Sequence, residues 1–68
     1  MDINIRKHII NNFKDANLED IKNSVETSIQ EQDEITLPGL GVLFELAWQN
    51  TNNKEEILNS ILRGLQRY

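Results

Sequence analysis

The chain contains no cysteine and only one histidine, His8, and this limits the chemistry that it can perform. Without cysteine there can be no disulfide, no thiolate nucleophile and no cysteine-based zinc site, a composition typical of intracellular proteins. A single histidine is too few for a multi-histidine metal site within one chain. We therefore expect no metal and no cofactor, and we expect His8 to be a solvated or half-buried structural residue.

The chain is also poor in proline, glycine and aromatic residues, and it has no long apolar run. It has one Pro, three Gly, one Trp, one Tyr and two Phe among its 68 residues. No apolar run approaches the ~20 residues that cross a bilayer, so we expect no membrane partner. A chain of this length buries only about 60% of its unfolded surface. We expect a single domain, residues 1–68, with a thin margin of stability.

Charge is distributed unevenly along the chain, whose formal net charge is -4. Residues 1–14 carry three basic residues and one acidic residue, whereas residues 15–56 carry ten acidic and two basic residues. Residues 57–68 carry only Arg63 and Arg67. An acidic middle repels phosphate backbones, which argues against non-specific nucleic-acid binding as the main role. The basic ends leave room for a local anion or DNA contact, for which the candidates are Arg6, Lys7, Lys14, Arg63 and Arg67.

Apolar residues recur at helical spacing in four segments, which predicts an all-α fold, a compact bundle of four short helices. We expect these helices at about 3–14, 18–31, 39–49 and 54–66. Asp2, Asn17 and Asn53 are the candidate N-caps, because their short polar side chains accept hydrogen bonds from the first helical turn. The connections are short, as is usual in helical bundles.

The third segment differs from the others because it is apolar nearly all round. Leu37 precedes Pro38, so we expect extended backbone at Leu37 and a helix that begins just after the proline. One face of this helix is expected to pack on the chain's own core, and it carries Leu40, Leu43, Phe44, Ala47 and Trp48. Val42 and Leu46 then point elsewhere, and such an apolar patch usually marks an interface.

These observations predict a homodimer through the third segment, with Val42 and Leu46 at or near the interface and Phe44 and Trp48 as further candidate interface residues. The alternative is that the loop 32–36 or the C-terminal turn covers Val42 and Leu46 within one chain. Light scattering distinguishes a dimer from a monomer of this size.

The sequence offers no catalytic residues. Ser24, Ser28 and Ser60 have no base nearby in the sequence, and adjacent carboxylates on a helix diverge by about 100°. The stretch Pro38 to Gly41 lacks the lysine and hydroxyl residue that complete a phosphate-binding loop. We expect no enzymatic activity and no small-molecule substrate.

Several blocks of the sequence carry a family resemblance. They are Met1 to Arg6, the nine residues Leu37-Pro38-Gly39-Leu40-Gly41-Val42-Leu43-Phe44-Glu45, the pair Trp48-Gln49, and Gly64-Leu65. Read over its whole length, the chain resembles the I-type small acid-soluble spore proteins, minor proteins of endospore-forming bacteria. The resemblance implies a non-enzymatic protein made during sporulation and held in the spore core. It supplies no catalytic residues.

A second resemblance concerns the stretch from Ile35 to Leu46, which is similar to part of the bacterial histone-like DNA-bending proteins. It implies an alternative α+β fold with a short hairpin around 35–46 and an alternative function in DNA binding. The Asn-rich and acidic residues 50–56 follow where such proteins carry a basic arm. The segment that grips DNA is therefore missing, and we rank this alternative second.

Overall fold

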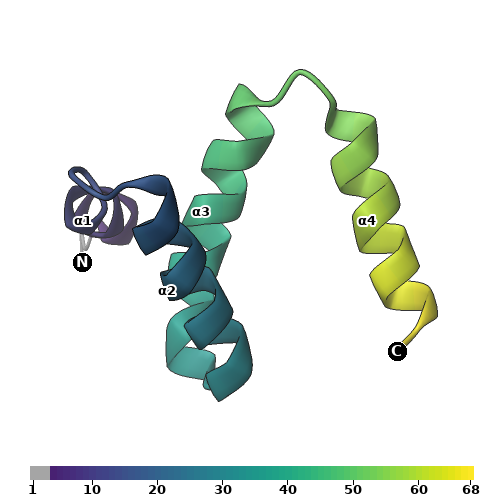
Figure 1. The fold of residues 1–68 in the computed structure, drawn as a ribbon, viewed down its shortest axis with the longest axis horizontal. Helices are drawn as coiled ribbons and strands as arrows, with labels where there is room; N and C mark the ends of the chain where they lie inside the picture. The colour runs from purple at the N-terminus through teal and green to yellow at the C-terminus, as the bar shows by residue number, and fades with distance from the viewer. Residues whose placement is uncertain (1–3) are drawn as a thin grey trace.

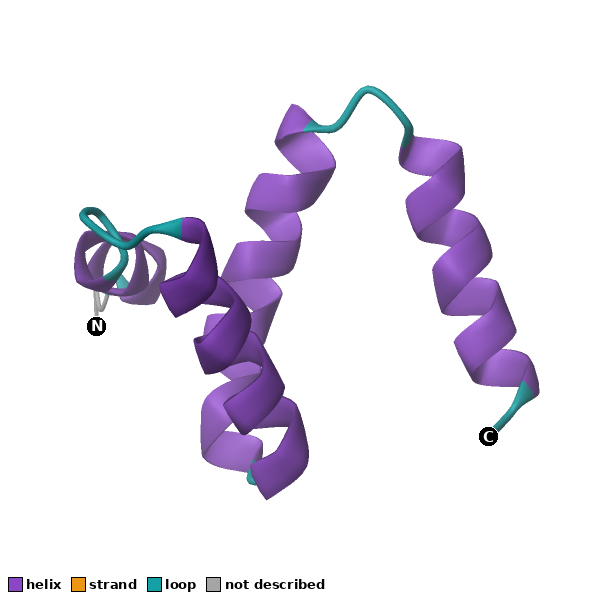
Figure 2. Cartoon of the chain, viewed as in Figure 1, coloured by secondary structure: helices purple, strands orange, loops and turns teal. Residues whose placement is uncertain are grey.

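The computed structural model describes residues 4–68, and this part of the chain is helical, with no strand (Figures 1 and 2). The helices are α1 (Ile5–Asn12), α2 (Leu18–Glu31), α3 (Leu37–Asn50) and α4 (Lys54–Gln66), and a short 3₁₀ helix, η1 (Glu34–Thr36), precedes α3. The predicted all-α class is confirmed. The alternative hairpin around 35–46 is wrong, because η1 and α3 occupy that segment.

Local hydrogen bonds define both ends of helix α1. The Asn4 side chain accepts a hydrogen bond from the Lys7 amide at 2.9 Å, so Asn4 is the N-cap. The predicted cap Asp2 lies outside the described residues. At the other end the Phe13 amide donates to the Ile10 carbonyl at 3.1 Å. This tight closing turn ends α1 at Asn12, two residues short of the predicted limit.

Helix α2 has the predicted bounds and a reciprocal cap at its start. The Asn17 side chain accepts from the Asp20 amide at 2.8 Å, and the Asp20 carboxylate accepts from the Asn17 amide at 3.4 Å. This capping box satisfies two amides that would otherwise lack partners. The helix ends at Glu31, and the next residue, Gln32, is its C-cap with a left-handed φ of 50°. The chain then turns back into η1.

Helix α3 starts two residues earlier than predicted. Leu37 has φ -60° and ψ -42°, so the expectation of extended backbone there is wrong. The physical reason is that η1 already carries the chain in helical geometry, and the Leu37 amide donates to the Glu34 carbonyl. Pro38 then falls in the first turn of α3, where its missing N–H leaves no helical hydrogen bond unmade.

Helix α3 is the centre of the fold, because α1 and α2 both pack against it (Figure 1). Val42 lies on the packed side of α3 and, at 7% exposure, is the one buried side chain among residues 4–68. The expectation that Val42 points away from the chain's own core is therefore wrong. Phe44 and Ala47, which were expected in that core, are exposed. Because α3 is apolar on nearly every side, its sequence pattern does not show which face α1 and α2 pack against.

Helix α4 stands apart from α1 and α2 and is joined to α3 by the three residues Thr51 to Asn53 (Figure 1). The two helices diverge from this connection; in Figure 1, α3 runs from teal to green and α4 from green to yellow. The N-cap of α4 is Asn53, as predicted; its side chain accepts a hydrogen bond from the Glu56 amide at 3.1 Å. The position of α4 leaves its apolar side open.

Candidate functional site

Exposed apolar side chains gather along one face of α3 and one face of α4. Lys54, Leu58, Ile61 and Leu65 are spaced three or four residues apart, so they share one face of α4. Leu37, Phe44 and Trp48 share one face of α3 by the same rule. We define the hairpin face as the six apolar residues of these two helix faces, Leu37, Phe44, Trp48, Leu58, Ile61 and Leu65. Five of them are between 42% and 67% exposed, and Trp48 is half-buried.

A groove shows that the two halves of the hairpin face look toward each other. Phe44 and Trp48 of α3 and Leu58 of α4 line it together. The Phe44 and Trp48 rings lie 6.2 Å apart, and the Lys54 ammonium sits 5.7 Å from the centre of the Trp48 ring. A cation at this distance from an indole is attracted by the ring. Lys54 therefore holds the first turn of α4 toward Trp48.

The loop between α3 and α4 is fixed by its own hydrogen bonds. The Asn50 side chain donates to the Leu46 carbonyl at 2.8 Å, and the Thr51 amide donates to the Ala47 carbonyl at 2.9 Å. The Thr51 hydroxyl accepts from the Asn53 amide at 3.1 Å. Asn50 and Thr51 thus tie the short connection to the end of α3 and to the start of α4.

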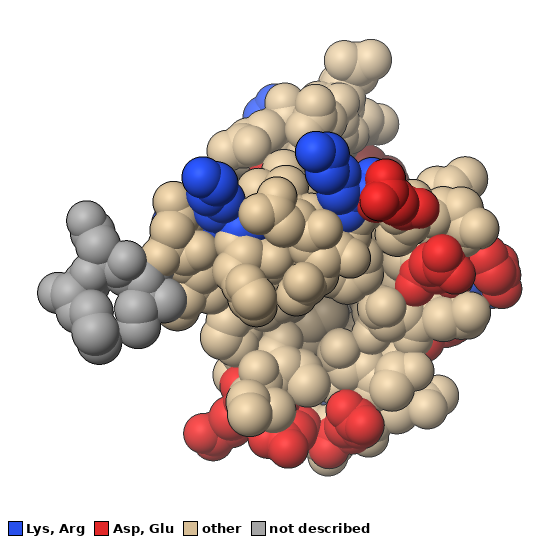
Figure 3. All heavy atoms as spheres, turned by 90° about the vertical axis from the view of Figure 1, so that its left-hand side faces the viewer, with Lys and Arg blue, Asp and Glu red and all other residues tan. Residues whose placement is uncertain are grey.

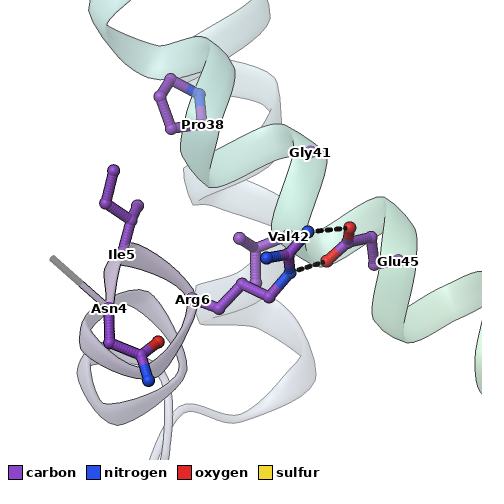
Figure 4. A pocket seen from close by; sticks show the side chains of 7 residues that line it. All are labelled: Asn4, Ile5, Arg6, Pro38, Gly41, Val42 and Glu45. Atoms are coloured by element: carbon purple, nitrogen blue, oxygen red, sulfur yellow. Dashed lines mark hydrogen bonds and ion pairs between the residues drawn. The ribbon is translucent and has the colours of Figure 1, made fainter. Parts of the chain in front are cut away.

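The second site is an open depression between α1 and α3, drawn in Figure 4. The Arg6 guanidinium donates two hydrogen bonds to the Glu45 carboxylate, at 2.6 and 2.7 Å, and Val42 lies beside this pair. The hydrogen bond from Arg6 lowers the pKa of Glu45, and the same contact raises the pKa of Arg6. Both side chains are solvent-accessible, so this pair orients α1 on α3 more than it stabilises the fold.

The structure does not bring the five candidate basic residues together. Arg6, Lys7 and Lys14 belong to α1 and the turn after it, whereas Arg63 and Arg67 lie at the end of α4. Arg6 is engaged by Glu45, and Arg63 lies 3.7 Å from Glu56. On the face shown in Figure 3, basic side chains occupy the upper part and acidic side chains gather at the lower and right-hand edges. Nothing here supports the DNA-binding alternative.

The predicted interface residues divide into two pairs. Phe44 and Trp48 lie on the hairpin face, open to a partner. Val42 packs within the chain, and Leu46, one turn further on the same side of α3, is half-buried. Sequence reasoning missed Leu58, Ile61 and Leu65 as interface candidates. Their helical spacing was visible in the sequence, but spacing alone does not show whether an apolar face packs within the chain or against a partner.

Two other kinds of site, a metal site and a membrane span, are not found among the described residues. Among residues 4–68, no three His, Asp or Glu side chains are grouped closely enough to hold a metal ion. In the same part of the chain, no helix is both long and apolar enough to cross a bilayer. His8 is exposed on α1.

Comparison with known proteins gives one consistent match. The family described as small, acid-soluble spore protein I matches residues 3–65. Proteins of that name from Halalkalibacterium halodurans and Bacillus subtilis are 38% and 40% identical over 68 residues. The first match covers 97% of this chain and 100% of the relative, and the second covers 97% and 96%. A Bacillus cereus protein of the same name is 35% identical over 69 residues, covering 98% of this chain and 100% of the relative.

No solved structure matches this chain. The resemblance drawn from the blocks around Leu37 to Glu45 is confirmed by the family match, which spans nearly every residue. The match also places the protein among spore proteins, in a family that is not named for an enzymatic activity. The chain belongs to the small, acid-soluble spore protein I family.

Proposed function

We propose that this protein is a non-enzymatic component of the spore core, made in the developing spore, that acts by self-association as a homodimer. The family supports a role in the spore. The net charge of -4 becomes about +8 when the eleven carboxylates and His8 are protonated. Strong positive charge without cysteine favours extraction into acid, which suits a protein of this family.

The exposed hairpin face is the observation that supports self-association. Monomeric proteins rarely leave a continuous apolar surface of this kind open to water, and large exposed patches mark interaction sites. Here both α3 and α4 present such a surface, and only Val42 is buried in the described chain. Binding another surface would therefore bury apolar side chains that the single chain leaves exposed.

Spore fractionation tests the location. The protein is expected in the acid extract of decoated spores only after they are broken mechanically, and it is expected to be absent from growing cells. Recovery in the coat extract of intact spores contradicts a place in the core. An abundant core spore protein, followed in the same fractions, serves as the control for breakage.

A further inference from the structure

The single chain exposes more surface than a folded monomer of its mass is expected to expose. The chain exposes 6185 Å². A folded monomer of 7.9 kDa is expected to expose roughly 4,400 Å², so the surplus is roughly 1,800 Å². The three N-terminal residues outside the described range could account for at most about 30% of it. A standard interface buries about 800 Å² per partner, so the surplus is ample for a stable dimer.

From this surplus, and from the self-association proposed above, we propose that the hairpin face binds the hairpin face of a second copy of this chain. The two copies are related by a two-fold axis perpendicular to the helices, and α3 and α4 of each copy form one antiparallel four-helix bundle. The partner is a second copy because the surplus exceeds the area that each chain of a standard dimer buries. Helix α3 has 14 residues and α4 has 13, so both are about 20 Å long at 1.5 Å per residue.

The two-fold axis specifies which residues meet. Phe44 lies at the middle of α3, and Ile61 lies at the middle of α4. Because the hairpin is antiparallel, these two residues stand at the same height. An axis through the centre of the hairpin face therefore places Phe44 beside the Phe44 of the second copy, and Ile61 beside the Ile61 of the second copy. Leu58 of one copy then approaches Leu65 of the other.

The charges at the ends of α4 favour this antiparallel arrangement. Glu55 and Glu56 lie in its first turn, and Arg63 lies in its last turn, with Arg67 directly after it. In an antiparallel pairing the acidic end of one α4 lies level with the basic end of the other, although Glu56 and Arg63 themselves lie on the polar side of the helix, away from Ile61. The helix dipoles are also opposed in this arrangement, which is favourable. A parallel pairing would set the like-charged ends of the two α4 helices level with each other.

Light scattering at about 50 μM tests the proposal with the variant Ile61→Glu and the matched control Leu18→Glu. Leu18 is 86% exposed at the start of α2, away from the hairpin face. Wild type and the control are expected at twice the 7.9 kDa chain mass. Ile61→Glu is expected to weaken dimerisation about 100-fold or more, because the symmetric interface would bury two unpaired carboxylates.

The results separate the two proposals. A monomeric wild type overturns both self-association and the role of the hairpin face. A wild-type dimer that Ile61→Glu leaves intact overturns the hairpin face alone. Circular dichroism shows whether Ile61→Glu keeps its helices.

Disulfide formation supplies a second readout that does not depend on a destabilising charge. The chain has no cysteine, so Ile61→Cys carries a unique thiol. It is expected to form a covalent dimer on mild oxidation, because the two sulfurs meet at the axis. Asn59→Cys, on the polar side of the same helix, is expected to cross-link at least ten-fold more slowly. Equal rates of cross-linking for the two variants contradict the proposed arrangement. Equal rates are also expected if α4 packs against α3 of its own chain, because Ile61 would then not meet the Ile61 of a second copy.

Discussion

Arg6 and Glu45 are separated by 39 residues in the sequence, yet the Arg6 guanidinium donates two hydrogen bonds, of 2.6 and 2.7 Å, to the Glu45 carboxylate. This contact joins α1 to α3 directly beside Val42, the buried side chain. The fork geometry of arginine orients both partners, which a lysine at position 6 would not do. The pair therefore fixes the direction in which α1 crosses α3.

Breaking this pair is expected to loosen α1 without unfolding the chain. Arg6→Gln and Glu45→Gln each lower the midpoint of thermal unfolding by about 1 to 5 °C, because exposed ion pairs contribute little. The double variant is expected to lose less than the sum of the two single losses, since the single changes remove the same contact. Calorimetry measures the three midpoints. Fully additive losses would show that Arg6 and Glu45 act independently.

The same pair gives stability a defined pH dependence. Because Arg6 lowers the pKa of Glu45 in the folded chain, the unfolded chain binds the proton more tightly. The contribution of the pair is therefore complete above the ordinary glutamate pKa of about 4.3, and it is lost as the pH falls through the lower folded value. Arg6, whose pKa is raised, stays charged throughout.

Thermal unfolding of wild type and Glu45→Gln between pH 7 and pH 2 measures this effect. The difference between the two midpoints is expected to shrink toward zero as the solution is acidified. Glu26→Gln, an exposed change on α2, controls for general charge effects. A difference that persists at the lowest pH contradicts the assignment to Glu45.

Val42 is expected to behave as a core residue. Val42→Ala lowers the free energy of unfolding by about 2 kcal/mol, because two buried methyl groups are lost and a small cavity remains. Leu18→Ala removes a larger but exposed side chain, and its effect is expected to stay within about 0.5 kcal/mol. Urea unfolding at equal protein concentration compares the two. A negligible cost at Val42 would mean that α1 does not cover it.

The cap of α2 is expected to contribute measurably to stability. Asn17→Ala removes the acceptor for the Asp20 amide and lowers the free energy of unfolding by about 1 kcal/mol. Asn23→Ala, in the exposed middle of α2, is the matched control and is expected to be neutral or slightly stabilising, since alanine is the better helix former. Equal losses at both positions would argue against a capping role.

Local sequence signals predicted the elements well. The bounds of α2 and α4 coincide with the prediction, and Asn17 and Asn53 cap them as expected. These features depend on residues close together in the chain, where hydrogen-bonding chemistry is readable. The early start of α3 was missed because a 3₁₀ turn overrode the usual extended preference of Leu37 before Pro38.

Relationships between elements were much less predictable. The third segment is apolar on nearly every side, so its pattern could not show that Val42 would be buried beside α1 while Phe44 stays exposed. The Arg6 to Glu45 contact has no local signal either. The hairpin face depends on the direction in which the loop after Asn50 sends α4, and no periodicity encodes that direction.

An isotope-filtered nuclear Overhauser measurement on mixed labelled and unlabelled chains tests the symmetric hairpin face most directly. It detects only protons of one chain that lie within about 5 Å of protons of the other, at the scale of side-chain contact. We predict intermolecular signals between the Ile61 methyl groups and from the Phe44 ring, with none from the Val42 methyl groups. Intermolecular signals confined to Val42 or Leu18, or their complete absence in a confirmed dimer sample, would contradict the arrangement.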